Sequence, residues 1–524
     1  MPWDYIIVGG GSAGSVLAAR LSEDPDARVL LLEAGPRDWH PFYAIPAGFA
    51  KMTKGIGSWG WQTVPQRHMR GMQIRFTQAR VLGGGSTVNA QIYTRGHPLD
   101  YDEWRQAGCT GWGYEDVLPY FRKAEDNDTW DNRWHGKGGP LGVSRPAAPL
   151  PICEAYFKAA GQIGIPTNGD LASETPEGVG YYQLTQRKVR RSSASKAYLD
   201  PSRGRPNLSI RTGAQVLRIA VEEGRAIGVE LAGEGTLRAE REVILSSGAI
   251  GSPRLLQLSG IGPADHLRDL GIRVVFDQPG VGANFHDHLD LFVIAECSGP
   301  HTYDRYAKPL WSAAAGVQYL LTRKGPVASS LFETGGFWWA DRSARSPDIQ
   351  FHLGLGSGIE AGVAAMPQGG VTLNSAFLRP RSRGTVRLAS ADPLAPPLID
   401  PNYWEDPYDR EMSIEGLKLA REIMRQDALK PFIRAERLPG PDVATKEDYV
   451  AYACAHAKTD HHPAGTCRMG ADPGAVVDPQ LRFNGIAGLR VVDASIMPQV
   501  VSSNTNAATI MIAEKASDLI RRAA

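Results

Sequence analysis

The segment that most constrains the fold of this chain lies at its N-terminus. Residues 4–8 (DYIIV) form an apolar run rich in β-branched side chains, which favours a buried parallel strand. The glycine pattern GxGxxG follows at once at residues 9–14, and residues 15–21 (SVLAARL) have the composition of a helix. A second apolar run, residues 28–32 (RVLLL), ends at Glu33. This order predicts a strand, a tight turn, a helix, a second parallel strand and an acidic residue at its end.

Each part of this unit suits the binding of a dinucleotide. Gly9 permits the tight turn, Gly11 lets the backbone approach a pyrophosphate, and Gly14 lets the helix pack closely on the strand. The N-terminus of the helix offers free N–H groups and a partial positive charge to the phosphates. Glu33 can accept hydrogen bonds from an adenosine ribose, and no basic residue in 34–36 (AGP) favours a 2′-phosphate. The unit does not separate FAD from NAD, although a start at residue 4 favours FAD, and a glycine-rich turn in an unrelated α/β protein is the alternative.

Composition excludes several other classes of protein. The chain has 524 residues, enough for more than one core, and 57 Lys and Arg balance 56 Asp and Glu to a net charge of +1. No overall field therefore attracts nucleic acid or an anionic membrane. No apolar run is long enough to span a membrane, and the first residues do not resemble a secretory signal. Five cysteines without a CxxC motif argue against a disulfide framework or a zinc knuckle, so we expect a cytoplasmic, soluble protein.

Further motifs carry a resemblance to a known family. Residues 79–96 read ARVLGGGSTVNAQIYTRG, residues 247–262 read SGAIGSPRLLQLSGIG, and the C-terminal block holds VVDAS at 491–495 and SNTNAAT at 503–509. They resemble the signature segments of the glucose–methanol–choline (GMC) oxidoreductases, which are FAD-dependent enzymes that oxidise alcohols. The resemblance runs from residue 4 to about residue 515. Among subgroups the chain is most similar to bacterial L-sorbose dehydrogenase-type enzymes.

The resemblance implies an FAD site built from these motifs. Some relatives attach FAD covalently through a histidine just before the asparagine of the first signature. Here Val88 precedes Asn89, and valine has no nucleophile, so we expect non-covalent FAD. The residues expected to contact FAD are Gly9, Gly11, Ser12, Ala13, Gly14, Glu33, Ala34, Arg80, Val81, Gly84, Ser86, Asn89, Ala90, Val216, Asp493, Ala494, Asn504 and Thr505.

The resemblance also implies a pair of catalytic residues. In the family, a histidine directly before the proline of the motif at 459–470 (TDHHPAGTCRMG) faces the flavin, and here it is His462. A histidine with an unperturbed pKa near 6.5 is mostly neutral at pH 7, so it can take the proton of an alcohol. The second position, a His or Asn before the C-terminal x-x-Thr, is Asn506, whose amide would orient the alcohol oxygen.

Other interpretations of these residues stay open. His462 in isolation is more often a histidine that packs a loop, and Asn506 also suits a helix N-cap. His461 is interpreted as a structural neighbour of His462. A metal bound by His456, His461 and His462, or by His286 and His288, lacks the usual spacing and an acidic partner, so we expect no metal site.

The order of the motifs predicts two interleaved domains of α/β class. A discontinuous, Rossmann-like FAD-binding domain comprises 1–149, 205–291 and 466–524. An α+β substrate domain comprises 150–204 and 292–465, and alternating apolar stretches at 334–339, 348–355 and 371–379 predict an antiparallel sheet in it. The basic run 187–191 (RKVRR) is interpreted as a solvated face.

The expected function is the oxidation of a primary or secondary alcohol, with a sugar or polyol similar to L-sorbose as the leading substrate. Hydride would pass to flavin N5, with His462 as base. Glu333 and Trp61 are candidate substrate contacts, although an acid in an ion pair and a core tryptophan are the simpler interpretations. The electron acceptor is a quinone, another carrier or O₂. An oxidase, a lyase acting on cyanohydrins and a non-catalytic binding protein remain alternatives, and the sequence does not indicate the oligomeric state.

Overall fold

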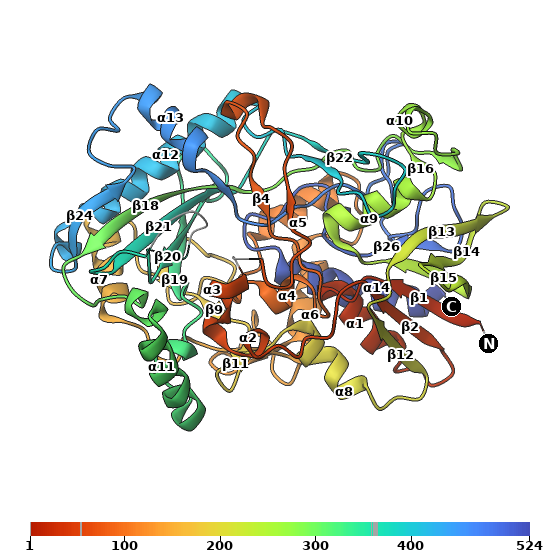
Figure 1. Ribbon diagram of the computed structural model, residues 1–524, viewed down its shortest axis with the longest axis horizontal. Coiled ribbons are helices and arrows are strands. Elements are labelled where there is room, and N and C mark those ends of the chain that lie inside the picture. The colour runs from red at the N-terminus through yellow and green to blue at the C-terminus, as the bar shows by residue number, and fades with distance from the viewer. Residues whose placement is uncertain (1, 53–54, 358, 360–364, 524) are drawn as a thin grey trace.

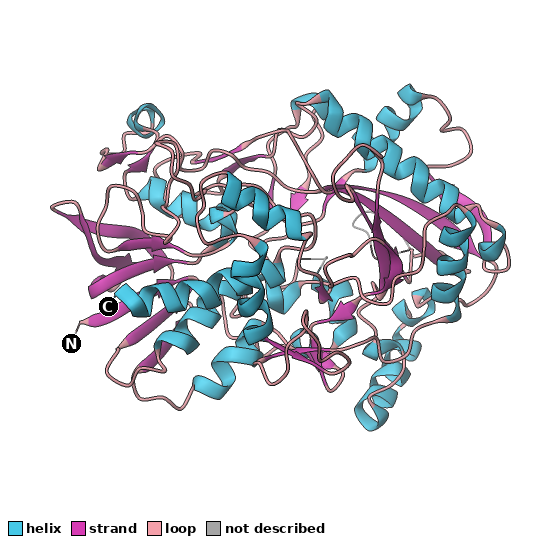
Figure 2. Cartoon of the chain, turned by 180° about the vertical axis from the view of Figure 1, so that it is seen from behind, coloured by secondary structure: helices cyan, strands magenta, loops and turns pink. Residues whose placement is uncertain are grey.

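The computed structural model describes residues 2–52, 55–357, 359 and 365–523. It has two large sheets at opposite ends of its long axis, and the two chain termini lie together beside the first (Figure 1). Figure 2 shows the same arrangement from behind, with helices packed along both sheets. In the described part of the chain, no helix combines the length and the apolar character needed to cross a membrane.

The first sheet confirms the N-terminal prediction. Strand β1 pairs in parallel with β2 on one side and with β15 on the other, and both β1 and β2 are buried. Helix α1 (Ser12–Leu21) begins three residues before the predicted helix, so Gly14 lies inside it. The sheet order is β12-β2-β1-β15-β14-β13, with β26 beside β15. Its strands are β1 (Trp3–Val8), β2 (Val29–Glu33), β12 (Leu208–Thr212), β13 (Val216–Glu222), β14 (Arg225–Leu231), β15 (Gly235–Leu245) and β26 (Leu489–Val491).

Three helices complete the core of this half. The C-terminal helix α14 (Asn506–Ala523) packs against α1 and against α6 (Tyr114–Ala124). Helix α9 (Gly248–Leu258) follows β15 and holds the second signature motif. The buried side chains of β1, β2, α1 and α14 form one apolar cluster. Burial of this cluster excludes water and stabilises the packing of strands that lie far apart in the sequence.

The second sheet is antiparallel over β18, β21, β20, β19 and β8, and the three predicted stretches form β19, β20 and β21. Helix α12 (Pro407–Met424) packs on it, with α7 (Pro151–Gln162) against α12. Its order is β24-β18-β21-β20-β19-β8, with β25 beside β18. The strands are β8 (Gly178–Tyr181), β18 (Leu289–Cys297), β19 (Thr334–Trp338), β20 (Ile349–Gly354), β21 (Gly370–Phe377), β24 (Ile433–Leu438) and β25 (Lys458–Thr459).

The strands of each sheet come from one of the two predicted sets of segments. The exception is β18, which begins at Leu289, three residues before the predicted boundary at 292. The domain limits themselves stay a prediction. A second apolar cluster lies between the second sheet and helices α7, α12 and α13 (Lys446–His456). The helix α11 (Pro309–Thr322) projects from this half of the molecule (Figure 1).

Candidate active site

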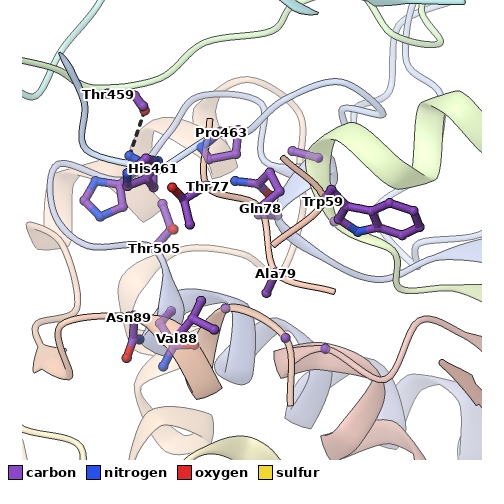
Figure 3. Close-up of a pocket in the computed structure, with 18 of the residues that line it drawn as sticks. Trp59, Thr77, Gln78, Ala79, Val88, Asn89, Thr459, His461, Pro463 and Thr505 are labelled. Atoms are coloured by element: carbon purple, nitrogen blue, oxygen red, sulfur yellow. Dashed lines mark hydrogen bonds between the residues drawn. The ribbon is translucent and has the colours of Figure 1, made fainter. Parts of the chain in front are cut away.

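A cavity of about 760 Å³ lies between the two sheets and is lined by residues of both. Val8 and Leu32 line it where β1 and β2 end, and Phe292 and His352 line it from the second sheet. Figure 3 shows a close-up, in which Val88 and Asn89 lie across the cavity from His461 and Pro463. Ligands of open parallel sheets bind at the carboxyl ends of the strands, so this position fits a dinucleotide.

Glycines leave room for a ligand at one end of the cavity. Gly84 has a φ of +54°, and a Cβ atom there would lie 2.6 Å from the Cα atom of Gly11. A Cβ atom on Gly14 would lie 1.9 Å from the carbonyl oxygen of Gly9, so α1 packs this closely only with glycine there. The two glycine motifs therefore meet at the start of α1, where the first N–H groups have no partner within the helix. This arrangement fits a pyrophosphate.

Glu33 is held by the backbone at the same end. Its Oε2 atom accepts a hydrogen bond from the Gly10 N–H at 2.9 Å, and its Oε1 atom accepts one from the Gly35 N–H at 2.7 Å. Burial raises the pKa of this carboxyl group, and the two N–H groups counteract that effect. Each oxygen keeps a further lone pair. Glu33 lines the cavity, so it fits ribose hydroxyls as predicted from its position in the motif.

Most of the residues expected to contact FAD line this cavity, and four do not. Gly14 packs α1 on the turn, and the Ser86 hydroxyl donates to the Gly83 carbonyl group at 2.6 Å. The Arg80 guanidinium lies over the ring of Trp59, and Val81 is buried in a small apolar cluster. The residues that line the cavity are Gly9, Gly11, Ser12, Ala13, Glu33, Ala34, Gly84, Asn89, Ala90, Val216, Asp493, Ala494, Asn504 and Thr505.

Asp493 joins the C-terminal block to the second signature motif. Its Oδ2 atom accepts hydrogen bonds from the Gly248 N–H at 2.9 Å and from the Ser252 hydroxyl at 2.6 Å. Its Oδ1 atom accepts one from the Ser495 N–H at 2.8 Å. Burial raises the pKa of this carboxyl group against these hydrogen bonds. Asp493 thus fixes the N-terminus of α9 at the edge of the cavity.

A chain of hydrogen bonds determines which nitrogen of His462 carries a proton. His288 Nε2 lies 3.1 Å from the Leu378 carbonyl oxygen, which can only accept, so this nitrogen carries a hydrogen. Burial lowers the pKa of His288 far below its ordinary value and keeps the ring neutral. His288 Nδ1 therefore has a lone pair, and His462 Nδ1, at 3.0 Å, is the donor to it. In neutral His462 the Nε2 atom is consequently unprotonated. Burial also lowers the pKa of His462, which favours this neutral form at pH 7.

The amide beside His462 belongs to Asn504 and not to Asn506. Asn504 Nδ2 lies 3.1 Å from His462 Nε2. Its Oδ1 atom accepts hydrogen bonds from Gln350 Nε2 at 3.0 Å and from the Thr94 hydroxyl at 3.2 Å, so the amide nitrogen must face the histidine. Asn506 begins α14, and its Oδ1 atom accepts from the Ser12 hydroxyl at 2.8 Å. Asn506 also lines the cavity, and its predicted role in orienting the alcohol oxygen stays a prediction.

The segment GANFHDH at 282–288 holds two loops of the site, one at His462 and one at Val500. The sequence analysis did not predict this role. Asp287 Oδ1 accepts from the His462 N–H at 2.7 Å, and its Oδ2 atom accepts from the hydroxyls of Thr459 and Tyr403. His286 Nε2 accepts from the Val500 N–H at 2.6 Å. The alternation of His286, Asp287 and His288 was a visible signal, but a single sequence does not say which loops these side chains reach.

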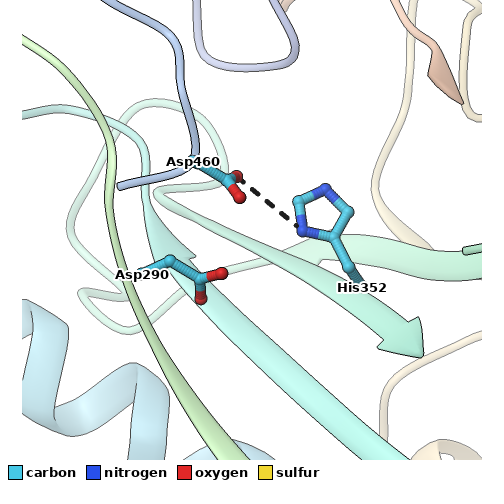
Figure 4. Close-up of side chains that lie close together, drawn as sticks. All are labelled: Asp290, His352 and Asp460. Carbon is cyan, nitrogen blue, oxygen red and sulfur yellow. Dashed lines mark ion pairs between the residues drawn. The ribbon is translucent and has the colours of Figure 1, made fainter. Parts of the chain in front are cut away.

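A charged group forms another part of the cavity wall. A ring nitrogen of His352 and one carboxylate oxygen each of Asp290 and Asp460 lie within 4.8 Å of one another (Figure 4). Lys458 forms an ion pair with Asp290, and its Nζ atom lies 3.9 Å from Asp460 Oδ1. The ammonium group of Lys458 thus supplies the cation that these carboxylates need. Asp460 Oδ2 lies 3.8 Å from His462 Nδ1, and its negative charge raises the pKa of that histidine against the effect of burial.

The two predicted substrate contacts differ in their placement. Trp61 lines the cavity and stacks on Trp59, with ring centroids 5.0 Å apart. Glu333 is buried but is not among the residues that line the cavity, and burial raises its pKa to about 7. Its expected contact with substrate stays a prediction.

Comparison with known proteins identifies the family. A family profile described as GMC oxidoreductase matches residues 3–290, and a second profile of the same description matches residues 380–513. This chain is a GMC oxidoreductase. The match covers both the glycine motifs of the first sheet and the loops that carry His462 and Asn504.

Relatives of this GMC oxidoreductase are similar over nearly its whole length. It is 41% identical over 529 residues to an alcohol dehydrogenase [acceptor] of Pseudomonas putida, with 99% of this chain and 96% of the relative covered. It is 42% identical over 534 residues to the mitochondrial choline dehydrogenase of Homo sapiens, with 99% of this chain and 90% of the relative covered. The crystal structure of pyridoxine 4-oxidase from Mesorbium loti has a TM-score of 0.90 at 34% identity, and each chain is 99% covered.

Membership in the family confirms three predictions. The GMC oxidoreductase is a flavoprotein that binds FAD, it acts on CH–OH donors, and its fold combines a Rossmann-like domain with a substrate domain. The glycine contacts, the N-terminus of α1 and Glu33 fit this cofactor. The relatives named above are alcohol and choline dehydrogenases and an oxidase, so the expected L-sorbose-like substrate finds no support in them.

Proposed function

We propose that this GMC oxidoreductase is an alcohol dehydrogenase in which His462 is the base and Asn504 holds the alcohol oxygen. The observation that carries the proposal is the hydrogen-bond chain from the Leu378 carbonyl group through His288 to His462. It leaves His462 Nε2 unprotonated beside the Asn504 amide group. A base and a hydrogen-bond donor then lie 3.1 Å apart in one cavity, within reach of the hydroxyl group of one alcohol.

The residues act on the alcohol as a pair. The hydroxyl group donates its proton to His462 Nε2, in place of Asn504, and its oxygen accepts a hydrogen bond from the Asn504 amide nitrogen. As the proton moves, His462 becomes a cation, and the Asp460 carboxylate 3.8 Å from Nδ1 stabilises it. His288 keeps the ring in one orientation by accepting the hydrogen bond from Nδ1. Gln350 and Thr94 hold the Asn504 side chain in the same way.

The cofactor would be held without a covalent bond. When bound, FAD supplies the acceptor for the hydride that leaves the alcohol carbon. The residues that would hold it are the glycines at the start of α1, Glu33 and the C-terminal block with Asp493. Val88 lines the cavity just before Asn89 and offers no nucleophile. Acid precipitation of the holoenzyme should therefore release all FAD into the supernatant, and yellow colour that remains on the precipitated chain would contradict this.

The walls of the cavity favour an alcohol with further hydrogen-bonding groups. Phe292 and Phe332 contribute an apolar surface, and His352, Lys458 and Asp460 a polar one. Within this polar surface the Lys458 ammonium group and the Asp460 carboxylate are opposite in charge, so the lining selects for neither sign. We therefore propose a neutral hydroxyl compound with polar substituents, such as a polyol or a hydroxymethyl heterocycle, as the substrate class.

The acceptor is proposed to be a quinone or another carrier. The relative from Pseudomonas putida is named as a dehydrogenase that uses an acceptor. A second candidate is O₂, because the structural neighbour from Mesorbium loti is an oxidase.

One experiment tests both the base and the acceptor. Alcohols are mixed anaerobically with the holoenzyme, and the bleaching of flavin absorbance is followed. His462→Gln should keep the spectrum of bound FAD and lose at least about 100-fold in the rate of bleaching, since general base catalysis contributes that much. A variant with normal bleaching would overturn the role of His462. Air is then admitted, and rapid reoxidation without a carrier would favour the oxidase.

A further inference from the structure

Helix α11 carries an apolar surface that is exposed on the outside of the molecule. Five of the nine large apolar side chains that are exposed in the described part of the chain lie on it, namely Leu310, Trp311, Val317, Leu320 and Leu321. Leu310 is 86% exposed and Leu321 is 80% exposed. Single exposed apolar residues are ordinary, but a cluster of this size on one helix marks an interaction surface.

Only one side of α11 contacts the rest of the protein. Ala315 and Tyr319, four residues apart, are its buried side chains, and the Tyr319 hydroxyl donates to the Val189 carbonyl group at 2.6 Å. Leu310, Val317 and Leu321 are spaced at i, i+7 and i+11 and share the opposite face. The helix has 14 residues and no charged side chain, and it extends from the lower edge of the molecule (Figure 1). This length suits a helix that lies in an interface rather than one that spans a bilayer.

Basic side chains predominate in the segments next to this face. Residues 305–332 contain four basic side chains, Arg305, Lys308, Arg323 and Lys324, and no acidic one. The basic run 187–191 lies beside α11, since Val189 accepts the hydrogen bond from Tyr319. Within that run Lys188 and Arg190 are exposed, whereas Arg187 pairs with Asp126. The chain as a whole has a net charge of only +1, so this surface is a local concentration of positive charge.

An apolar helix face with basic residues at its ends is complementary to an anionic lipid surface. Leucine and tryptophan side chains enter the boundary between headgroups and acyl chains, and Lys and Arg pair with the phosphates. We propose that α11 and the 187–191 turn form a peripheral docking surface for a membrane that contains anionic phospholipid. The sequence analysis expected no attraction to such a membrane, because the net charge of the chain is only +1. The structure brings several basic side chains together at one surface, which the net charge does not show.

Vesicle co-sedimentation of the holoenzyme tests this proposal. The vesicles are phosphatidylcholine alone and an equal mixture of phosphatidylcholine and phosphatidylglycerol. We expect binding to the mixed vesicles that weakens as salt is raised, and much weaker binding to the neutral ones. The double variant Leu320→Ser/Leu321→Ser should lower the partition coefficient about 100-fold, since each buried leucine contributes about tenfold. Lys308→Gln/Lys324→Gln should lower it on the mixed vesicles only, by about tenfold or more.

A matched control separates the surface from general hydrophobicity. Leu394 is 69% exposed on a loop outside α11, and Leu394→Ser should bind vesicles as the parent does. All variants should keep bound FAD and the rate of flavin bleaching, because none of these side chains lines the cavity. Equal binding of the parent and of Leu320→Ser/Leu321→Ser would overturn the proposal. Absence of vesicle binding together with an oligomer that this variant dissociates would also overturn it and assign α11 to contacts between copies of the chain.

Discussion

His462 Nδ1 lies 3.0 Å from His288 Nδ1, although 174 residues separate the two in the sequence. Two facing Nδ1 atoms form a hydrogen bond only if one of them carries a hydrogen, and the Leu378 carbonyl group decides which. The proton lies on His462 Nδ1, and the base faces the cavity. A contact between two histidines thus sets the reactive form of one of them, as partners of the other ring nitrogen do for histidines in general.

Replacement of His288 tests this positioning role. His288→Leu removes the acceptor for His462 Nδ1, and we expect flavin bleaching by alcohol to slow by about 10- to 100-fold, because the ring is no longer held in one tautomer and orientation. His288→Asn keeps an acceptor near the Nδ1 position and should recover much of the rate. The measurement is anaerobic stopped-flow absorbance with bound FAD confirmed beforehand. If both variants are equally slow, the loss is due to packing and not to the hydrogen bond.

The two asparagines should separate orientation of the alcohol from the structure of the cofactor site. Asn504→Ala removes the amide group beside His462, and we expect the bleaching rate to fall about 10- to 100-fold with FAD affinity nearly unchanged. Asn506→Ala removes the acceptor for Ser12 at the start of α1 and should weaken FAD binding more than it slows bleaching. FAD affinity is measured by fluorescence titration of the apoprotein. Slow bleaching in Asn506→Ala together with weakened FAD binding in Asn504→Ala would contradict this assignment and give the catalytic role to Asn506.

The charge of Asp460 should shift the pH dependence of flavin reduction. Burial lowers the pKa of His462, so the parent should stay active below pH 6.5, where an unperturbed histidine is half protonated, and lose activity only at lower pH. Asp460 raises this pKa, so Asp460→Asn should move the acid limb further down and slow the plateau about three- to tenfold, because the base is weaker. Lys458 lowers the pKa, and Lys458→Met should move the limb up. Shifts of the same sign in both variants would contradict this account.

Two neighbouring glycines give a matched pair for the cofactor site. At Gly84 a Cβ atom would lie 2.6 Å from Gly11, and the φ of +54° is strained for other residues, so Gly84→Ala should abolish stable FAD binding. At Gly85 a Cβ atom would meet no atom of the protein within 4 Å, so Gly85→Ala should retain more FAD than Gly84→Ala does. The ratio of flavin to protein absorbance after gel filtration measures both. Equal loss in both variants would show that the motif tolerates no side chain for another reason.

The sequence by itself determined the family, the cofactor and the start of the fold. The pattern at residues 4–33 is largely local: β1, the turn and α1 follow one another in the chain, and Gly14 is required by the Gly9 carbonyl group beside it. The alternating stretches at 334–379 likewise predicted antiparallel strands, since their period of two is a property of each segment alone.

Only the tertiary structure decided which side chains meet in the cavity. Asn504 and Asn506 are two residues apart, and the sequence assigned the first to the cofactor and the second to catalysis, but in the structure Asn506 accepts from Ser12 of α1 and Asn504 lies beside His462. His288 reaches His462 across 174 residues of sequence, and Glu333 is buried outside the lining of the cavity. Such contacts depend on the packing of two sheets, which no local pattern contains. The exposure of the apolar face of α11 is likewise decided by the tertiary structure. The helical period shows which residues share a face but not whether the fold covers that face.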